Sequence, residues 1–112
     1  MALVPFRFTD EGPIKHRPAV VESAYAFQQT RAEVIVAAVT SNLSHRPLLG
    51  DHFIQDWQVA GLLKPSRTTA ILRTLRHAMV AGQLGAVSTA DLAQIDRAVA
   101  SALGSGSALQ TP

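Results

Sequence analysis

The sequence VIVAAVTSN, residues 34–42, decides the fold of this chain. Its first six residues are apolar and rich in β-branched side chains, which predicts a short strand buried on both faces. The strand stops at Thr40, Ser41 and Asn42, three small residues that form hydrogen bonds. Such residues favour turns, but at the mouth of a rigid buried strand they can also hold a reactive group in place. Both interpretations stay open at this point.

Length and composition indicate one domain. The chain has 112 residues, of which 47% are hydrophobic, enough for a single modest core. It contains no cysteine, which excludes a disulfide framework and a thiolate zinc site. Residues 1–9 lack the features of a signal peptide, and no apolar run approaches the roughly 20 residues that span a bilayer. We therefore expect a cytoplasmic protein with no membrane segment.

Positive charge is concentrated in the second half of the chain. Between Asp56 and Asp91 there is no acidic residue. The basic residues of this block are Lys64, Arg67, Arg73, Arg76 and His77. Arginine dominates, and its planar guanidinium pairs with phosphate oxygens at two points. The block is either a solvated face or a surface for a polyanionic partner, such as nucleic acid or an acidic protein segment.

The pattern along the chain predicts short strands followed by one helix. We expect strands over residues 2–6, 18–22, 33–41 and 61–66, a helical turn over 23–29, and a loop over 42–50. From Thr68 to Ala81 the spacing of apolar residues predicts a helix, although the β-branched residues there favour a strand. A compact, mainly β, barrel-like sheet with a C-terminal helix follows.

The terminal helix has clear start and stop signals. Ser88 can cap it, with Asp91 three residues later near the positive end of the helix dipole. Gly104 is expected to end it. One face is predicted to contain Leu92, Ile95, Val99 and Leu103. Residues 105–112 are expected to form a disordered tail.

The usual enzyme motifs are absent from the sequence. The histidines are scattered without the paired spacing of zinc sites, and there is no glycine-rich phosphate loop or Gly-x-Ser-x-Gly elbow. We therefore expect no metal and no cofactor. If the second and third strands pair antiparallel, Arg17 comes within reach of Thr40. A cation and a hydroxyl suit phosphoryl chemistry because fixed donors stabilise charge on a phosphorane; a surface ion pair is the alternative role of Arg17.

Five segments in order resemble the MazF/PemK family of toxin-antitoxin ribonucleases. They are LVPFRFTD (3–10), KHRPAVV (15–21), VAAVTSN (36–42), GLLKPS (61–66) and LGAVS (84–88). The resemblance covers residues 1–104, almost the whole chain, and implies an SH3-like barrel that pairs as a homodimer. It also implies that residues 68–75 are mainly strand. The implied activity is sequence-specific, metal-independent cleavage of single-stranded mRNA by 2′-hydroxyl attack, inhibited by a cognate antitoxin.

The resemblance also implies a catalytic pair. Arg17 would stabilise the phosphorane and Thr40 would orient the phosphate. Because arginine stays protonated and is a poor base, His16 is a hypothesis for proton transfer, and Ser41 is a possible catalytic or RNA-binding residue. The candidate RNA-binding residues are Lys15, Asn42, Ser44, His45, Arg46 and Lys64. The chain lacks the Gly-Asp pair that the family usually carries before its first strand, and its loop 42–50 is its own, so the RNA sequence preference cannot be transferred.

Two other functions fit the same barrel. One is a CcdB-like DNA gyrase poison, which relies on a tryptophan near the C-terminus. The only tryptophan here is Trp57, which lies far from the C-terminus, and this position argues against a gyrase poison. We expect Trp57 to lie in the core or in an interface. The other is a non-catalytic SH3-like binding module, against which the presence of Arg17 and Thr40 speaks.

Overall fold

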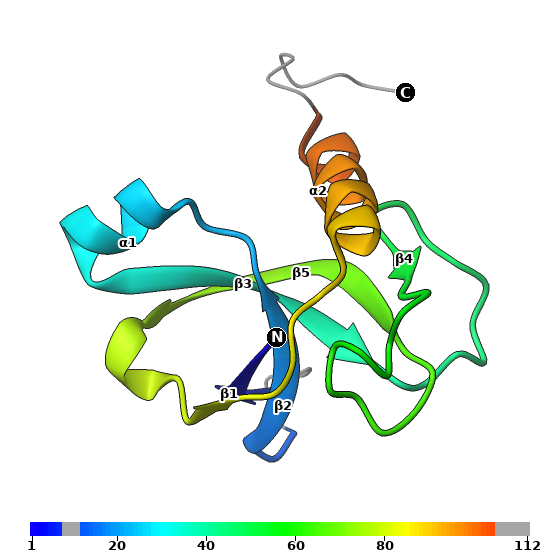
Figure 1. The fold of residues 1–112 in the computed structure, drawn as a ribbon, viewed down its shortest axis with the longest axis horizontal. Helices are drawn as coiled ribbons and strands as arrows, with labels where there is room; N and C mark the ends of the chain where they lie inside the picture. Colours follow the sequence, from blue (N-terminus) through cyan, green and yellow to red (C-terminus); the bar gives the residue numbers. More distant parts are fainter. Residues whose placement is uncertain (8–11, 105–112) are drawn as a thin grey trace.

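The computed structural model describes residues 1–7 and 12–104, which form an antiparallel six-stranded sheet and three helical segments (Figure 1). The strands are β1 (Ala2–Phe6), β2 (Lys15–Val21), β3 (Glu33–Thr40), β4 (His52–Phe53), β5 (Arg67–Arg76) and β6 (Gly82–Gln83). The helices are α1 (Tyr25–Arg31), the 3-10 helix η1 (His77–Met79) and α2 (Thr89–Leu103). The prediction of a mainly β fold with a C-terminal helix is confirmed. The predicted tail lies outside the described residues.

Strand β3 lies at the centre of the sheet, whose order is β4-β5-β3-β2-β1-β6. It is buried on both faces, as its apolar sequence predicts. Val34, Val36 and Ala38 belong to one hydrophobic cluster, with residues of β1 and β2. Val39 belongs to a second cluster that includes Ile95 of α2. A β-bulge between Ala37 and Val39 interrupts the register with β5. Four consecutive residues of β3 are buried because a hydrophobic cluster covers each face.

The edge strands β4 and β6 do not pair with each other within the described residues. The turn that follows β4 instead meets the segment that follows β6, where the Gly85 amide donates to the Ala60 carbonyl at 3.0 Å. The two backbones are so close that a Cβ on Gly85 would lie 2.4 Å from the carbonyl oxygen of Val59. This contact connects the two ends of the sheet without a strand pair.

The strand predicted over residues 61–66 is wrong. Gly61 has a φ of +84° and the amides of Gly61 and Leu62 donate to Gln58 and Trp57, which makes this segment part of a turn. Apolar residues and a flanking glycine look the same in a strand and in a turn that packs on a core. Trp57 packs against the cluster of Ile95, in agreement with its expected place.

The helix predicted by periodicity over residues 68–81 is also wrong, and the strand implied by the family resemblance is confirmed as β5. This strand pairs with β3 on one side and β4 on the other. Leu72 contacts one cluster and Leu75 the other, because residues an odd number apart leave opposite faces of a strand. A strand with apolar residues on both faces therefore imitates helical spacing. Strand β2 begins three residues before its predicted start, and α1 is displaced from the predicted turn by two residues.

Helix α2 packs on one side of the sheet next to β4 and β5 (Figure 1). The predicted capping is confirmed, since the Ser88 hydroxyl accepts from the amide of Asp91 at 3.1 Å, and Gly104 ends the helix. The buried face consists of Asp91, Ile95 and Val99. The predicted face was wrong at its two ends: Leu92 and Leu103 are 38% and 68% exposed. No helix in residues 1–7 and 12–104 has the length and apolar character to cross a membrane.

The carboxylate of Asp91 attaches α2 to the loop after β4. It accepts hydrogen bonds from the amides of Gln55 and Asp56, both at 2.9 Å, and from the ring of His52 at 2.8 Å. Burial would raise the pKa of Asp91, but the hydrogen bonds from His52, Asp56, Gln55 and Ser88 outweigh it and lower the pKa. A carboxylate with a depressed pKa stabilises the fold above its unfolded pKa.

We expect Asp91→Asn to lower the free energy of unfolding at pH 7 by about 2 kcal/mol, because charge-assisted hydrogen bonds are lost in a buried site. The difference should shrink as the pH falls below 3.8 toward the depressed pKa of the folded state. Urea denaturation at pH 7 and at low pH measures it, with the exposed Asp56→Asn as control. An equal difference at every pH would contradict the role of the charge.

Glu22, the residue directly after β2, contacts Asp96 of α2. Burial, a hydrogen bond with Asp96 and the charge of Asp96 raise the pKa of Glu22 from 4.5 to about 8. The unfolded chain therefore loses this proton above 4.5 while the folded chain keeps it, and stability falls as the pH rises from 4.5 to 8. We expect the urea midpoint of Glu22→Gln to fall less over this pH range than that of the wild type. Asp96→Asn should likewise reduce the fall of the urea midpoint over this pH range. If the urea midpoints of all three proteins change in parallel with pH, the interaction between Glu22 and Asp96 does not control the pH dependence.

Candidate functional site

The candidate site lies where β2 and β3 separate. The two strands pair antiparallel, as expected, but only from Ala19 opposite Ala38 to Val21 opposite Val36. The same register would place Arg17 opposite Thr40, yet the ladder stops before this point. Pro18 lies between Arg17 and the last pair, and proline has no N–H to donate to a ladder. The strand ends therefore leave open space on both sides of Thr40.

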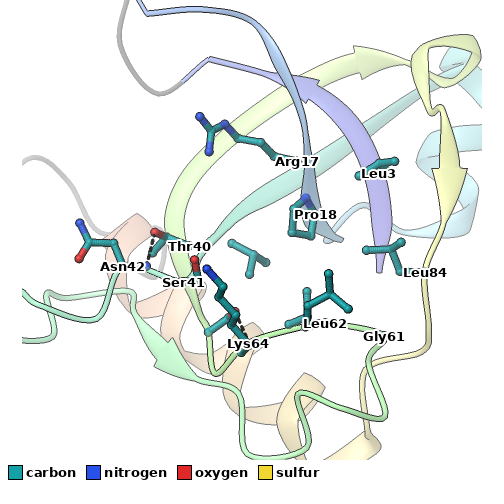
Figure 2. Close-up of a pocket in the computed structure, with 13 residues that line it drawn as sticks. Leu3, Arg17, Pro18, Thr40, Ser41, Asn42, Gly61, Leu62, Lys64 and Leu84 are labelled. Atoms are coloured by element: carbon teal, nitrogen blue, oxygen red, sulfur yellow. Dashed lines mark hydrogen bonds between the residues drawn. The ribbon is translucent and has the colours of Figure 1, made fainter.

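One space is a cavity of about 600 Å³ with aliphatic walls, which we call the leucine-lined cavity. Its apolar residues are Leu3, Pro18, Val39, Leu62, Leu63 and Leu84, and its polar side chains are Arg17, Thr40, Ser41, Asn42, Lys64 and Ser66. Figure 2 shows Thr40 and Ser41 between Arg17 and Lys64. Two cationic side chains and two hydroxyls thus surround the end of β3.

A second space, the loop cavity, has a volume of about 610 Å³ and lies between loop 42–51 and β5. It is lined by Arg17, Thr40, Asn42, His45, Leu48, Leu49, Asp51, Arg67, Thr69, Ala70 and Ile71. Arg17, Thr40 and Asn42 line both cavities. We call these three residues the shared wall.

Hydrogen bonds fix the polar residues that end β3. The hydroxyl oxygen of Thr40 accepts from the amide of Asn42 at 3.1 Å, which leaves the O–H of Thr40 as a donor. The side-chain oxygen of Asn42 accepts from the amide of Ser44 at 3.1 Å and from its hydroxyl at 2.6 Å. The turn interpretation of these residues is therefore correct, and Thr40, which belongs to this turn, also lines both cavities.

Arg67 holds the loop cavity together from within. Its side chain is 7% exposed, its NH1 donates to the carbonyl of His45 at 3.0 Å, and its Nε lies 3.6 Å from the Asp51 carboxylate. Asp51 in turn accepts from the amide of Leu48 at 2.9 Å. Strand β5 places Arg67 directly opposite Thr40. This buried ion pair joins loop 42–51 to the strand next to the site.

The structure brings together some of the predicted site residues and separates the others. Arg17, Thr40, Ser41, Asn42, Lys64 and His45 line one or both cavities. Lys15, His16, Ser44 and Arg46 are exposed and line neither cavity. Adjacent residues of a strand point to opposite faces, so the side chains of His16 and Arg17 diverge. The Ser44 hydroxyl is used within the loop.

Sequence reasoning missed the structural role of Arg67 and the aliphatic walls. Arg67 appeared as one member of a basic block, but β5 distributes that block: Arg67 is buried, and Arg73 lies over the ring of Phe6 at 5.2 Å. Only the register with Thr40 identifies Arg67, and that register is not readable from one sequence. Among residues 1–7 and 12–104, no group of three or more histidine, cysteine, aspartate or glutamate side chains could hold a metal ion.

Comparisons with known proteins identify the family. A family model described as PemK-like, MazF-like toxin of type II toxin-antitoxin system matches residues 2–103. No curated protein sequence matches the chain significantly.

Solved structures share the fold at low sequence identity. Mycobacterium tuberculosis toxin MazF-mt6 has a TM-score of 0.71 and 19% identity over 91% of this chain and 93% of that one. An endoribonuclease in complex with its cognate antitoxin, from a mycobacterial species, has a TM-score of 0.71 and 20% identity over 99% and 95% of the two chains. MazF (Form-I) from Deinococcus radiodurans has a TM-score of 0.65 and 24% identity over 92% and 93%.

The anchor at Arg67 can be tested directly. Arg67→Gln leaves the buried Asp51 carboxylate without its cation, which we expect to cost about 3 kcal/mol of stability and to speed amide hydrogen exchange at Leu48. Native-state hydrogen exchange by NMR measures the local effect, with the exposed Arg46→Gln as control. Adding Asp51→Asn to Arg67→Gln should recover part of the loss. Unchanged exchange in Arg67→Gln would contradict the anchor.

Proposed function

Because the chain belongs to the PemK-like, MazF-like toxin family of type II toxin-antitoxin systems, we propose that it is an endoribonuclease that cuts single-stranded mRNA at short specific sequences. The observation that carries the proposal is the meeting of Arg17 and Thr40 in a wall shared by two cavities. A relative by fold, the mycobacterial protein above, is named as an endoribonuclease. The cavities offer room on both sides of a phosphate held by that wall.

In the proposed reaction the ribose 2′-hydroxyl attacks the adjacent phosphorus. The bond from the 2′-oxygen to phosphorus forms and the bond from phosphorus to the 5′-oxygen breaks, which leaves a 2′,3′-cyclic phosphate and a 5′-hydroxyl. The proton of the attacking hydroxyl is removed and the departing 5′-oxygen gains one. The nucleophile and the leaving group both belong to the RNA, and the mechanism as proposed uses no metal ion.

The protein then needs to stabilise the charge of the phosphorane. Arg17 supplies a permanent cation with several N–H donors. Thr40 supplies an O–H whose direction is restrained because its oxygen already accepts from the Asn42 amide. Lys64, across Thr40 and Ser41 from Arg17 (Figure 2), supplies a second cation for the phosphate backbone. Fixed donors of this kind are the main source of rate acceleration in such chemistry.

His16 stays a hypothesis for proton transfer. Its side chain leaves β2 on the face opposite Arg17 and lines neither cavity, so its position gives the hypothesis no support. The pH profile of cleavage by His16→Ala tests it: an unchanged profile removes His16 from the mechanism. Lys15, Ser44 and Arg46 are proposed only as exposed positions that an RNA strand crosses outside the cavities.

The proposal includes the partners of a toxin. The mycobacterial relative was solved with its cognate antitoxin, and we propose that this chain pairs as a homodimer and is inhibited by an antitoxin of its own. An acidic segment of that antitoxin would compete with RNA for Arg17 and Lys64, because carboxylates and phosphates bind the same donors.

The decisive experiment incubates the purified chain in EDTA with a long RNA of mixed sequence and maps the new ends. We expect discrete cuts in the wild type and a loss of about 10²- to 10³-fold in rate in Arg17→Ala, the usual cost of removing one fixed donor at a phosphorane. Intact RNA with a well-folded protein would reject the ribonuclease in favour of a gyrase poison or a binding module.

Thr40 provides a matched pair of variants. Thr40→Val removes the hydroxyl at nearly constant volume and should slow cleavage by about 10²-fold. Thr40→Ser keeps the O–H donor and also the hydroxyl oxygen that accepts from the Asn42 amide. This variant should therefore retain most of the activity. Equal activity of Thr40→Val and Thr40→Ser would exclude the hydroxyl from the reaction.

A further inference from the structure

The shared wall divides the site into two compartments of similar size. The leucine-lined cavity and the loop cavity have volumes of about 600 and 610 Å³, within the range of small-molecule sites and large enough for a nucleoside. Arg17, Thr40 and Asn42 belong to both. A phosphate held at this wall therefore has one compartment on each side, as a dinucleotide step requires.

We propose that the two cavities hold the nucleosides on the two sides of the cleaved bond, and that His45 in the loop cavity discriminates between bases. The inference rests on the proposed ribonuclease function and goes further, because it assigns different tasks to the two cavities. The leucine-lined cavity accepts its base by apolar packing, and the loop cavity reads its base through hydrogen bonds.

The composition of the leucine-lined cavity supports the first task. Leu3, Leu62 and Leu84 form walls that offer apolar contact, which every base accepts. Its cation Lys64 lies with Ser41 next to the shared wall (Figure 2), in a position for the phosphate backbone. The Ser66 hydroxyl already donates to the carbonyl of Lys64 at 2.8 Å. Aliphatic packing has no directional contacts, so it binds a base with little selectivity.

The polar groups of the loop cavity point to His45 as the reader. The Thr69 hydroxyl donates to Ala38 and accepts from Ile71. Arg67 and Asp51 pair with each other and with the loop backbone. When the three residues of the shared wall are set aside, the exposed ring of His45 is the lining group with the most donors and acceptors left for a base.

The backbone of His45 is also held in place. Its carbonyl accepts from the buried Arg67 at 3.0 Å, and its Nε2 lies 3.5 Å from the side-chain nitrogen of Asn42. An imidazole can both donate and accept hydrogen bonds and can stack on a base. The buried ion pair of Arg67 and Asp51 thus fixes the point of the loop from which the ring of His45 reaches the cavity.

The test maps the ends produced from one pool of mixed-sequence RNA by four proteins. These are the wild type, His45→Ala, Leu84→Ala and Arg97→Ala, each checked by thermal melting; Arg97 is exposed on α2 and lines neither cavity. For each protein, base frequencies are counted at the positions immediately before and after the cuts. We expect His45→Ala to reduce base preference about tenfold at one flanking position, the scale of one lost hydrogen bond. Leu84→Ala should slow all cuts without changing base preference, and Arg97→Ala should change neither.

The outcomes separate this inference from the function on which it rests. Cuts that Arg17→Ala abolishes, with base preference unchanged in His45→Ala, would overturn the role of His45 and leave the ribonuclease intact. A change in base preference in Leu84→Ala as large as that in His45→Ala would overturn the division of tasks. Absence of cutting by the wild type would reject the ribonuclease itself and this inference with it.

Discussion

Burial of β3 on both faces is the constraint on which the rest of the structure depends. The strand has β5 on one side and β2 on the other, so its backbone is paired along both edges while its side chains enter two separate hydrophobic clusters. A strand held in this way cannot shift by one residue without exchanging the side chains of the two clusters. Thr40, its last residue, therefore has a fixed position at the edge of the core.

The site exists because this pairing stops before the strand does. Pro18 interrupts the donors of β2, Thr40 and Asn42 turn the chain through their own hydrogen bonds, and the two cavities occupy the space that further ladder would fill. A buried ion pair on the far side, between Arg67 and Asp51, supports the loop that leaves the strand. Arg17 and Thr40 thus stand on paired strands, and a cavity lies on each side of them.

Helix α2 is attached by two carboxyl groups that respond to burial in opposite ways. Asp91 receives enough hydrogen bonds to remain charged, and its pKa is lowered. Glu22 meets another carboxyl, Asp96, and its pKa is raised to about 8. The first contact requires the ionised form and the second the protonated form, so attachment of the helix depends on pH at both ends of the range. Desolvation acts alike on both groups, and their hydrogen-bond partners decide the sign.

The sequence by itself determined the elements whose signals are local. The apolar run of β3, the Ser88 cap with Asp91 and the stop at Gly104 depend on a few neighbouring residues, and the family resemblance supplied the strand nature of β5. Arg17 and Thr40 could be brought together from antiparallel pairing alone. Tertiary structure decided everything that requires a register or a contact between distant segments. The backbone of Val59 to Gly61 lies against Gly85, which a single sequence does not reveal. Leu92 and Leu103 stay exposed because Asp91, Ile95 and Val99 form the buried face of α2. The burial of Arg67 opposite Thr40 follows from the register of β5. The spacing of apolar residues in a sequence indicates which faces of a segment are apolar. Only the packing of distant segments decides what covers each face.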